Sequence, residues 1–158
     1  EFNSFSKAYN MAGWRLGMAM GNAEALALVE TYKSQQDSAI FAPIMAAGEA
    51  ALQSDPAWIA ARNQVYQERR DVVVSGLREA GFEVATPVAA LYVWAPLPVA
   101  ESSVDFCSRL LEDTGVSTTP GSVFGAHGEG YLRISLVTGK ERLAEGTRRI
   151  ADWMKEKA

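Results

Sequence analysis

Short alternating segments and longer apolar stripes divide the first half of the chain into predictable elements. Residues 1–5 alternate between polar and apolar side chains and predict the end of a strand, and residues 16–21 predict a second short strand. A helix is expected after Asn22, a favourable N-cap residue, and another over residues 43–52. The longest predicted helix covers residues 54–81, with a proline near its first turn and a glycine at its end. A helix of about 25 residues extends roughly 40 Å, which is long enough to join two layers or two domains.

Beyond this helix the pattern changes to short apolar runs separated by prolines and glycines. Four strands are expected, over residues 82–86, 91–95, 116–119 and 131–137. Two helices are expected, over residues 103–114 and 140–155, and the first of them places Val104, Cys107, Leu110 and Leu111 on one apolar face. This order of elements predicts a small α+β layer in which helices pack on a mainly antiparallel sheet.

Composition and charge exclude several classes of protein. Of the 158 residues, 48% are hydrophobic and 22% are charged, which is typical of a globular chain, and the net charge of -4 argues against a nucleic-acid surface. No apolar run approaches the roughly 20 residues of a membrane-spanning helix, so no membrane partner is expected. Cys107 is the only cysteine, which predicts a reducing, cytoplasmic location, and with His127 as the only histidine a transition-metal site is not expected. There is no signal peptide, and the missing initiator Met predicts that residue 1 is a truncation point.

One segment gathers the side chains of a phosphate-binding site next to a reactive amine. Ser4-Phe5-Ser6-Lys7 is followed by Gly13-Trp14-Arg15-Leu16-Gly17. A guanidinium binds a phosphate through two parallel hydrogen bonds, hydroxyls add neutral donors, and glycines let the backbone approach closely. A lysine becomes nucleophilic where desolvation or a neighbouring cation lowers its pKa. The set therefore suits a lysine held beside a phosphorylated aldehyde.

This segment resembles the cofactor-lysine signature of the class I/II aminotransferases, which have the fold-type I architecture. The family pattern is Ser-x-Ser-Lys followed by Gly-x-Arg-x-Gly, with the arginine eight residues after the lysine, and every one of those positions matches. The longer string over residues 1–21 is most similar to the LL-diaminopimelate aminotransferase-like branch. The resemblance implies an α/β fold made of three parts. These are a C-terminal remnant of the large cofactor-binding domain (1–54), a long interdomain helix (55–81) and a small α+β domain (82–158).

The resemblance also implies a cofactor and roles for individual residues. Lys7 would form the Schiff base with pyridoxal 5'-phosphate and later move the proton between the substrate α-carbon and the cofactor. Ser4, Ser6 and Arg15 would bind the cofactor phosphate. The implied activity is transfer of an amino group between an amino acid and a 2-oxo acid, by a homodimer in the full-length parent. Groups that hold the cofactor ring precede the lysine in this family, so residues 1–158 alone are expected to be inactive.

A second resemblance lies near the end of the chain. Residues 130–135, Gly-Tyr-Leu-Arg-Ile-Ser, resemble the family's late strand, and the loop 120–125 resembles the segment before it. By this resemblance Arg133 would bind the substrate α-carboxylate through a bidentate contact. Strand alternation puts Leu132 and Ile134 on one face and Arg133 on the other, and that other face suits either a binding site or solvent.

Three other interpretations remain open at this point. A carbon–sulfur lyase of the same fold would use Lys7 and Arg15 equally well and would differ in releasing a thiol. An aminotransferase-like effector domain of a transcription regulator would need a DNA-binding domain upstream. A freestanding α+β interaction module would require both motifs to occur by coincidence.

Overall fold

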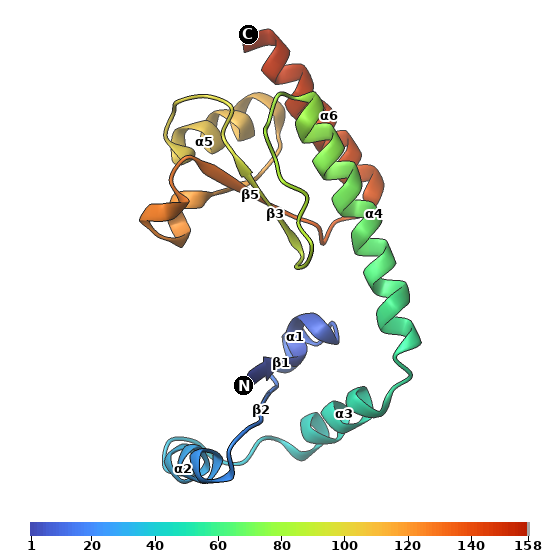
Figure 1. Ribbon diagram of the computed structural model, residues 1–158, viewed down its shortest axis with the longest axis vertical. Helices are drawn as coiled ribbons and strands as arrows, with labels where there is room; N and C mark the ends of the chain where they lie inside the picture. The colour runs from blue at the N-terminus through green and yellow to red at the C-terminus, as the bar shows by residue number, and fades with distance from the viewer. Residues whose placement is uncertain (158) are drawn as a thin grey trace. The chain divides into compact units, whose positions relative to one another are not determined.

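The computed structural model describes residues 1–157, and the chain divides into two compact units, residues 1–61 and 62–158 (Figure 1). Helix α4 (Ala57–Glu79) begins in the first unit and continues into the second. Within residues 1–157, no helix combines the length and the apolar character needed to cross a membrane.

The first unit contains a short strand pair and three α-helices besides the start of α4. Its elements are β1 (Phe2–Ser4), α1 (Phe5–Ala8), the 3₁₀ turn η1 (Ala12–Trp14), β2 (Gly17–Ala19), α2 (Ala23–Ser34) and α3 (Ala42–Gln53). The predicted cap of α2 is confirmed, because the Asn22 side chain accepts a hydrogen bond from the backbone N–H of Ala25 at 3.0 Å. Both predicted strands and the helix expected over residues 43–52 are also present.

A small apolar contact anchors the strand pair to α3. Phe5 and Leu16 are buried, and a Cβ added at Gly48 would lie only 2.5 Å from Leu16 Cδ2. Gly48 therefore lets α3 approach these two side chains closely. By contrast, α2 buries no residue, and Leu28 and Phe41 are 73% and 70% exposed. Large apolar side chains of this unit thus remain uncovered by the rest of the unit.

The second unit is built on a three-stranded antiparallel sheet in the order β3-β5-β4. The strands are β3 (Tyr92–Pro96), β4 (Thr119–Pro120) and β5 (Tyr131–Ser135). Two 3₁₀ turns, η2 (Gly121–Phe124) and η3 (Ala126–Gly128), form the loop between β4 and β5. The helices are α4, α5 (Ser103–Thr114) and α6 (Lys140–Lys157). The expected α+β layer with an antiparallel sheet is confirmed.

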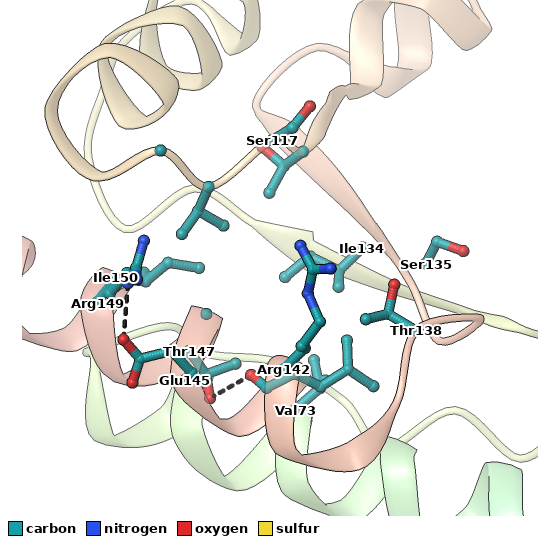
Figure 2. Close-up of a pocket in the computed structure, with 15 residues that line it drawn as sticks. Val73, Ser117, Ile134, Ser135, Thr138, Arg142, Glu145, Thr147, Arg149 and Ile150 are labelled. Carbon is teal, nitrogen blue, oxygen red and sulfur yellow. Dashed lines mark hydrogen bonds and ion pairs between the residues drawn. The ribbon is translucent and has the colours of Figure 1, made fainter.

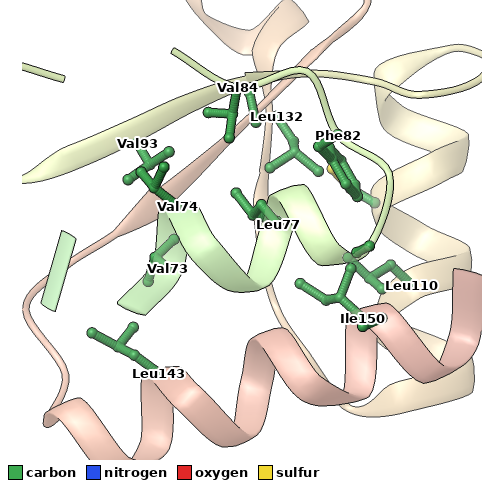
Figure 3. Close-up of a cluster of buried hydrophobic side chains, with 14 of the residues drawn as sticks. Val73, Val74, Leu77, Phe82, Val84, Val93, Leu110, Leu132, Leu143 and Ile150 are labelled. Atoms are coloured by element: carbon green, nitrogen blue, oxygen red, sulfur yellow. The ribbon is translucent and has the colours of Figure 1, made fainter. Parts of the chain in front are cut away.

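One face of this sheet packs on helices to form the core (Figure 3). Val93 of β3 and Leu132 of β5 are fully buried, as are Leu77 of α4 and Leu110 of α5. Helix α6 adds Ile150 to the same cluster (Figure 3). Burial of each such side chain stabilises the fold by about 1.5–3 kcal/mol, so this cluster holds the sheet against its helices.

Two predicted strands are wrong or shortened. Residues 82–86 have no strand pairing, although Phe82 and Val84 are buried. The Arg78 guanidinium donates to the carbonyl oxygen of Val84 at 2.9 Å, so a side chain occupies an acceptor that a neighbouring strand would otherwise use. Of the strand expected over residues 116–119, only Thr119 lies in a strand, the two-residue β4.

The predicted apolar face of α5 also needs correction. Val104 and Leu111 are 49% and 47% exposed, whereas Phe106 is fully buried. Cys107 and Leu110 are buried as expected. The buried stripe includes Phe106 because its ring meets the edge of another core ring, that of Trp153, at 5.4 Å between centroids.

Candidate functional site

The register of β1 and β2 brings the two halves of the Ser/Lys and Gly/Arg motif together. Ser4 pairs with Gly17, and the backbone N–H of Phe5 continues the ladder by donating to the carbonyl oxygen of Leu16 at 3.1 Å. A Cβ at Gly17 would lie 3.0 Å from the carbonyl oxygen of Asn3, so glycine permits the close pairing of the strands. The two parts of the motif, which a loop separates in the sequence, therefore lie side by side in the first unit.

The two serines differ in what their hydroxyls do. Ser4 is the N-cap of α1, and its Oγ accepts the backbone N–H of Ser6 at 3.1 Å. That bond uses an oxygen lone pair and leaves the hydroxyl proton of Ser4 available for a ligand. The Ser6 hydroxyl makes no hydrogen bond within residues 1–157 and is half-buried. Both hydroxyls can therefore donate to an anion.

Arg15 is held in an uncommon backbone conformation directly before β2. Its φ of 53° lies in the left-handed region, as does that of Asn10 at 56°. For residues other than glycine this conformation costs roughly 1 kcal/mol or more, and it is concentrated at functional sites. The Arg15 guanidinium donates from Nη1 to the carbonyl oxygen of Ala12 at 3.0 Å, which fixes the side chain but uses only one of its N–H groups. The remaining donors suit a phosphate.

Lys7 lies in the last turn of α1, three residues after the Ser4 cap and on the exposed surface of the unit. The ring of Phe5 in the same helix packs against Tyr9, and Tyr9 packs against Trp58, with centroid separations of 5.2 and 6.0 Å. Tyr9, which directly follows α1, therefore connects this helix to Trp58, while Phe5 at its start is buried. The combination of one amine, two hydroxyls and a guanidinium fits a phosphorylated aldehyde.

Arg133 belongs to the second unit and projects from the face of the sheet opposite the core. It pairs directly with Trp94 of β3, while the neighbouring Leu132 pairs with Ala95, and both of these are fully buried. The predicted alternation of β5 is therefore confirmed. The face that carries Arg133 is aromatic, because Trp94 stacks on Tyr131 at 5.6 Å between ring centroids.

The guanidinium of Arg133 lies close to two aromatic rings. Its Cζ is 4.3 Å from the ring centroid of Tyr92 and 4.5 Å from that of Phe124. Its Nε is buried and has no hydrogen-bond partner among residues 1–157. Two aromatic rings therefore lie close to the guanidinium, and its in-plane N–H groups can match a carboxylate through two parallel bonds. Sequence reasoning did not identify Tyr92 or Phe124 as site residues; the only signal was that Tyr92 shares the strand parity of Trp94.

A separate pocket lies near the C-terminal end of β5. It has a volume of about 400 Å³, and α6 contributes Arg142 and Arg149 to its lining (Figure 2). The Arg142 side chain extends into the hollow, whereas Arg149 is held by Glu145 at 2.8 Å. Neither Lys7 nor Arg133 lines this pocket, so it is distinct from the residues with candidate chemistry.

Comparison with known proteins agrees with the motifs. The family described as aminotransferase class I and II matches residues 1–150. The LL-diaminopimelate aminotransferase of Oleidesulfovibrio alaskensis is 47% identical over 151 residues, which is 96% of this chain and 39% of that enzyme. The enzyme of the same name from Syntrophobacter fumaroxidans is 46% identical over 150 residues, 95% of this chain and 39% of its own.

A solved structure extends the likeness to the fold. The probable N-succinyldiaminopimelate aminotransferase from Thermus thermophilus superposes with a TM-score of 0.90 at 37% identity, covering 96% of this chain and 41% of that one. This chain spans 39% of the length of the two curated relatives above. The match runs through both units and includes both motifs, which is incompatible with a module whose motifs arose by coincidence. The chain belongs to the class I and II aminotransferase family.

Proposed function

We propose that this chain carries the cofactor lysine and the substrate-binding arginine of an enzyme that transfers an amino group between an amino acid and a 2-oxo acid. Class I and II aminotransferases use pyridoxal phosphate. The observation that supports the proposal most strongly is the β1–β2 register, which aligns Ser4 with Gly17 inside a family match over residues 1–150. We propose LL-diaminopimelate as the amino acid, because the relatives named for it are 47% and 46% identical to the chain.

The architecture that accompanies this proposal is that of a fold-type I aminotransferase. Residues 1–54 would belong to its large domain, residues 55–81 to the connecting helix and residues 82–158 to its small domain. A cytoplasmic homodimer is part of the same proposal. The exposed apolar side chains of α2 and of the start of α3 are consistent with coverage by further protein.

The phosphate of the cofactor would be held by Ser4, Ser6 and Arg15. Each serine offers a hydroxyl proton, and Arg15 offers the N–H groups that its bond to Ala12 leaves unused. A hydrogen bond to a charged group contributes about 1.5–3 kcal/mol, so these donors together would anchor the phosphate. The bond of Arg15 to a backbone carbonyl orients its guanidinium before the ligand arrives.

Lys7 would bind the aldehyde carbon of the cofactor through Nζ and later carry a proton. When bound, pyridoxal phosphate supplies a ring that accepts the electron pair released at the substrate α-carbon. The Lys7 amine would also act as the base that holds the substrate α-carbon proton on Nζ. Arg133 would hold the substrate carboxylate in its guanidinium plane, so that Tyr92 and Phe124 define the direction of approach.

Reductive labelling of the chain tests the central part of this proposal. The purified chain is incubated with pyridoxal 5'-phosphate, reduced with borohydride and digested, and the pyridoxyl group is located by mass spectrometry. We expect the label on Lys7, with Lys33, Lys140, Lys155 and Lys157 as internal comparisons. The variant Lys7→Arg should lose that label, whereas the matched control Lys140→Arg should keep it. Label distributed evenly over all lysines would overturn the assignment of Lys7.

A further inference from the structure

Glu129 makes an unusual connection between the loop before β5 and the start of α5. Its carboxylate accepts the backbone N–H of Ser103 at 2.6 Å and the Ser103 hydroxyl at 3.1 Å. Ser103 is fully buried although its side chain is polar. Glu129 lies four residues before Arg133, so this connection is next to the strand that carries the guanidinium.

A second serine extends the connection to the 3₁₀ turn η2. The Ser103 and Ser122 hydroxyl oxygens are 3.0 Å apart, and the backbone N–H of Ser122 donates to Ser103 Oγ at 3.3 Å. Ser103, Ser122 and Glu129 thus form one set, called the Glu129 network below. The backbone N–H of Ser103 holds the pKa of the Glu129 carboxyl below its ordinary value, with further bonds from Gly130, Ser103 and Ser122. The site therefore favours an ionised, acceptor-only group.

Helix capping alone does not explain this network. The N-cap of α5 is Ser102, whose Oγ already accepts the backbone N–H of Asp105 at 3.1 Å. Glu129 accepts the first helical N–H, that of Ser103, and in addition the Ser103 hydroxyl, which also bonds Ser122 near the other end of the loop between β4 and β5. The function of the network therefore concerns the loop more than the helix.

The loop itself is closed by two glycines on opposite sides of its turn. A Cβ at Gly121 would lie 2.0 Å from the carbonyl oxygen of Gly128, so the two backbones are in direct contact. Phe124 lies between these glycines at the tip, where it is 51% exposed. The ring nevertheless contacts Arg133 at 4.5 Å and Trp94 at 5.6 Å. Its position depends on how the loop is fastened at its base.

We propose that Glu129, acting through Ser103 and Ser122, is a positioning residue that holds Phe124 against the guanidinium of Arg133. The rings of Phe124 and Tyr92 both lie close to the guanidinium carbon, at 4.5 and 4.3 Å. The clamped group presents its edge to a substrate carboxylate. This inference rests on the carboxylate-binding role of Arg133 in the proposed function and adds the residues that set its geometry.

The side-chain NMR signal of Arg133 measures this contact directly. In the ¹⁵N-labelled chain, the Nε–Hε resonance of Arg133 is assigned from its loss in Arg133→Lys, and the rings of Tyr92 and Phe124 should shift it from the usual position. We expect Glu129→Gln to move the Arg133 Nε–Hε resonance toward the chemical shift of an arginine without ring contacts. The reason is that the glutamine amide places an N–H group against the donors of Ser103, which need an acceptor. Phe124→Leu should have the same effect, whereas Phe124→Tyr should retain the original shift.

Controls separate positioning from loss of structure. Glu112→Gln also removes one carboxylate charge, but from α5 outside the Glu129 network, and should leave the Arg133 signal unchanged. Methyl signals of Leu132, buried on the opposite face of β5, should be the same in every variant. Ser122→Ala supplies a milder change of the network and should shift the Arg133 signal in the same direction as Glu129→Gln. An unmoved Arg133 signal in both Glu129→Gln and Ser122→Ala would overturn the positioning role.

Titration with acetate distinguishes this inference from the function on which it rests. In the wild-type chain acetate should shift the Arg133 signal, and in Glu129→Gln its affinity should be weaker by about two- to fivefold, the effect of losing one cation–aromatic contact. A wild-type signal that does not respond to acetate, but still moves in Glu129→Gln, would overturn the carboxylate role and leave the positioning contact established. Equal acetate affinity in both proteins would show that the contact does not prepare Arg133 for a carboxylate.

Discussion

Two helical glycines in the second unit should respond to alanine with opposite signs. At Gly76 of α4 an added Cβ would lie 2.5 Å from Thr147 Oγ1 and 2.6 Å from Thr147 Cβ. Thr147 is buried in α6, and its Cβ is fixed to the helix backbone, so the two helices would have to separate. At Gly146 of α6 the nearest atom is Val116 Cγ1 at 3.9 Å, which is an ordinary contact.

The magnitudes follow from two opposing effects. Replacing glycine by alanine inside a helix stabilises it by about 1 kcal/mol, and this is the whole effect expected for Gly146→Ala. In Gly76→Ala the same gain is opposed by overpacking, which costs about 1–3 kcal/mol and more where backbone must move. Separation of the helices would also loosen the buried cluster to which Leu77 and Ile150 belong. We expect a net loss of about 1–2 kcal/mol for Gly76→Ala.

Urea unfolding of the two variants, followed by circular dichroism, measures both effects. The comparison holds where the m-values of the variants are equal. The wild-type chain should lie between them, and the two variants should differ in unfolding free energy by about 2–3 kcal/mol. Thermal unfolding gives the same order, because 1 kcal/mol shifts Tm by about 4–8 °C in a domain of 60–100 residues. If Gly76→Ala stabilised the chain as much as Gly146→Ala does, the close approach of α4 and α6 at Thr147 would be refuted.

Three further predictions concern acid stability, a helix cap and the core. Hydrogen bonds from Arg148 and Arg149 lower the pKa of Glu145 from its ordinary 4.5 to about 2. The stabilisation is therefore present above the ordinary value and is lost as the pH falls through about 2, and unfolding between these pH values should be less pH-dependent in Glu145→Gln. Ser102→Ala should lower the unfolding free energy by about 0.5–2 kcal/mol by removing the cap of α5, and faster amide exchange of its first turn would verify this. Leu77→Ala should cost about 2–5 kcal/mol in denaturant unfolding, because the side chain is fully buried, and a loss below about 1 kcal/mol would contradict its place in the core.

Helices were predictable because their signals are local. Asn22 caps α2 as its residue type predicts, and Gly81 follows α4 with a φ of 88°, a conformation that favours glycine. The strand expected over residues 82–86 failed for a reason that the hydrophobic pattern does not carry. Alternating burial of Phe82 and Val84 resembles a strand, but the partner of the Val84 carbonyl is the side chain of Arg78. Periodicity reports burial and cannot report which group satisfies the backbone.

The candidate site was likewise only partly predictable from the sequence. The spacing of Lys7 and Arg15 is visible in the sequence, and the roles assigned to them remain predictions. The aromatic contacts of Arg133 were not predictable, because they depend on the pairing of β3 with β5 and on closure of the loop that carries Phe124. Glu129 gave no sequence signal beyond being a charged residue in a glycine-rich loop. Its contact with Ser103 joins residues 26 positions apart, and such contacts exist only in the folded unit.

The most direct test of the central claim is whether the phosphate directs the aldehyde to Lys7. The rate of Lys7 labelling is measured with pyridoxal 5'-phosphate and with pyridoxal, which lacks the phosphate, in the wild-type chain and in Arg15→Ala. The account predicts labelling at least about tenfold faster with the phosphorylated aldehyde, from one or two charge-assisted hydrogen bonds, and a much smaller preference in Arg15→Ala. Equal rates for the two aldehydes in the wild-type chain would contradict it.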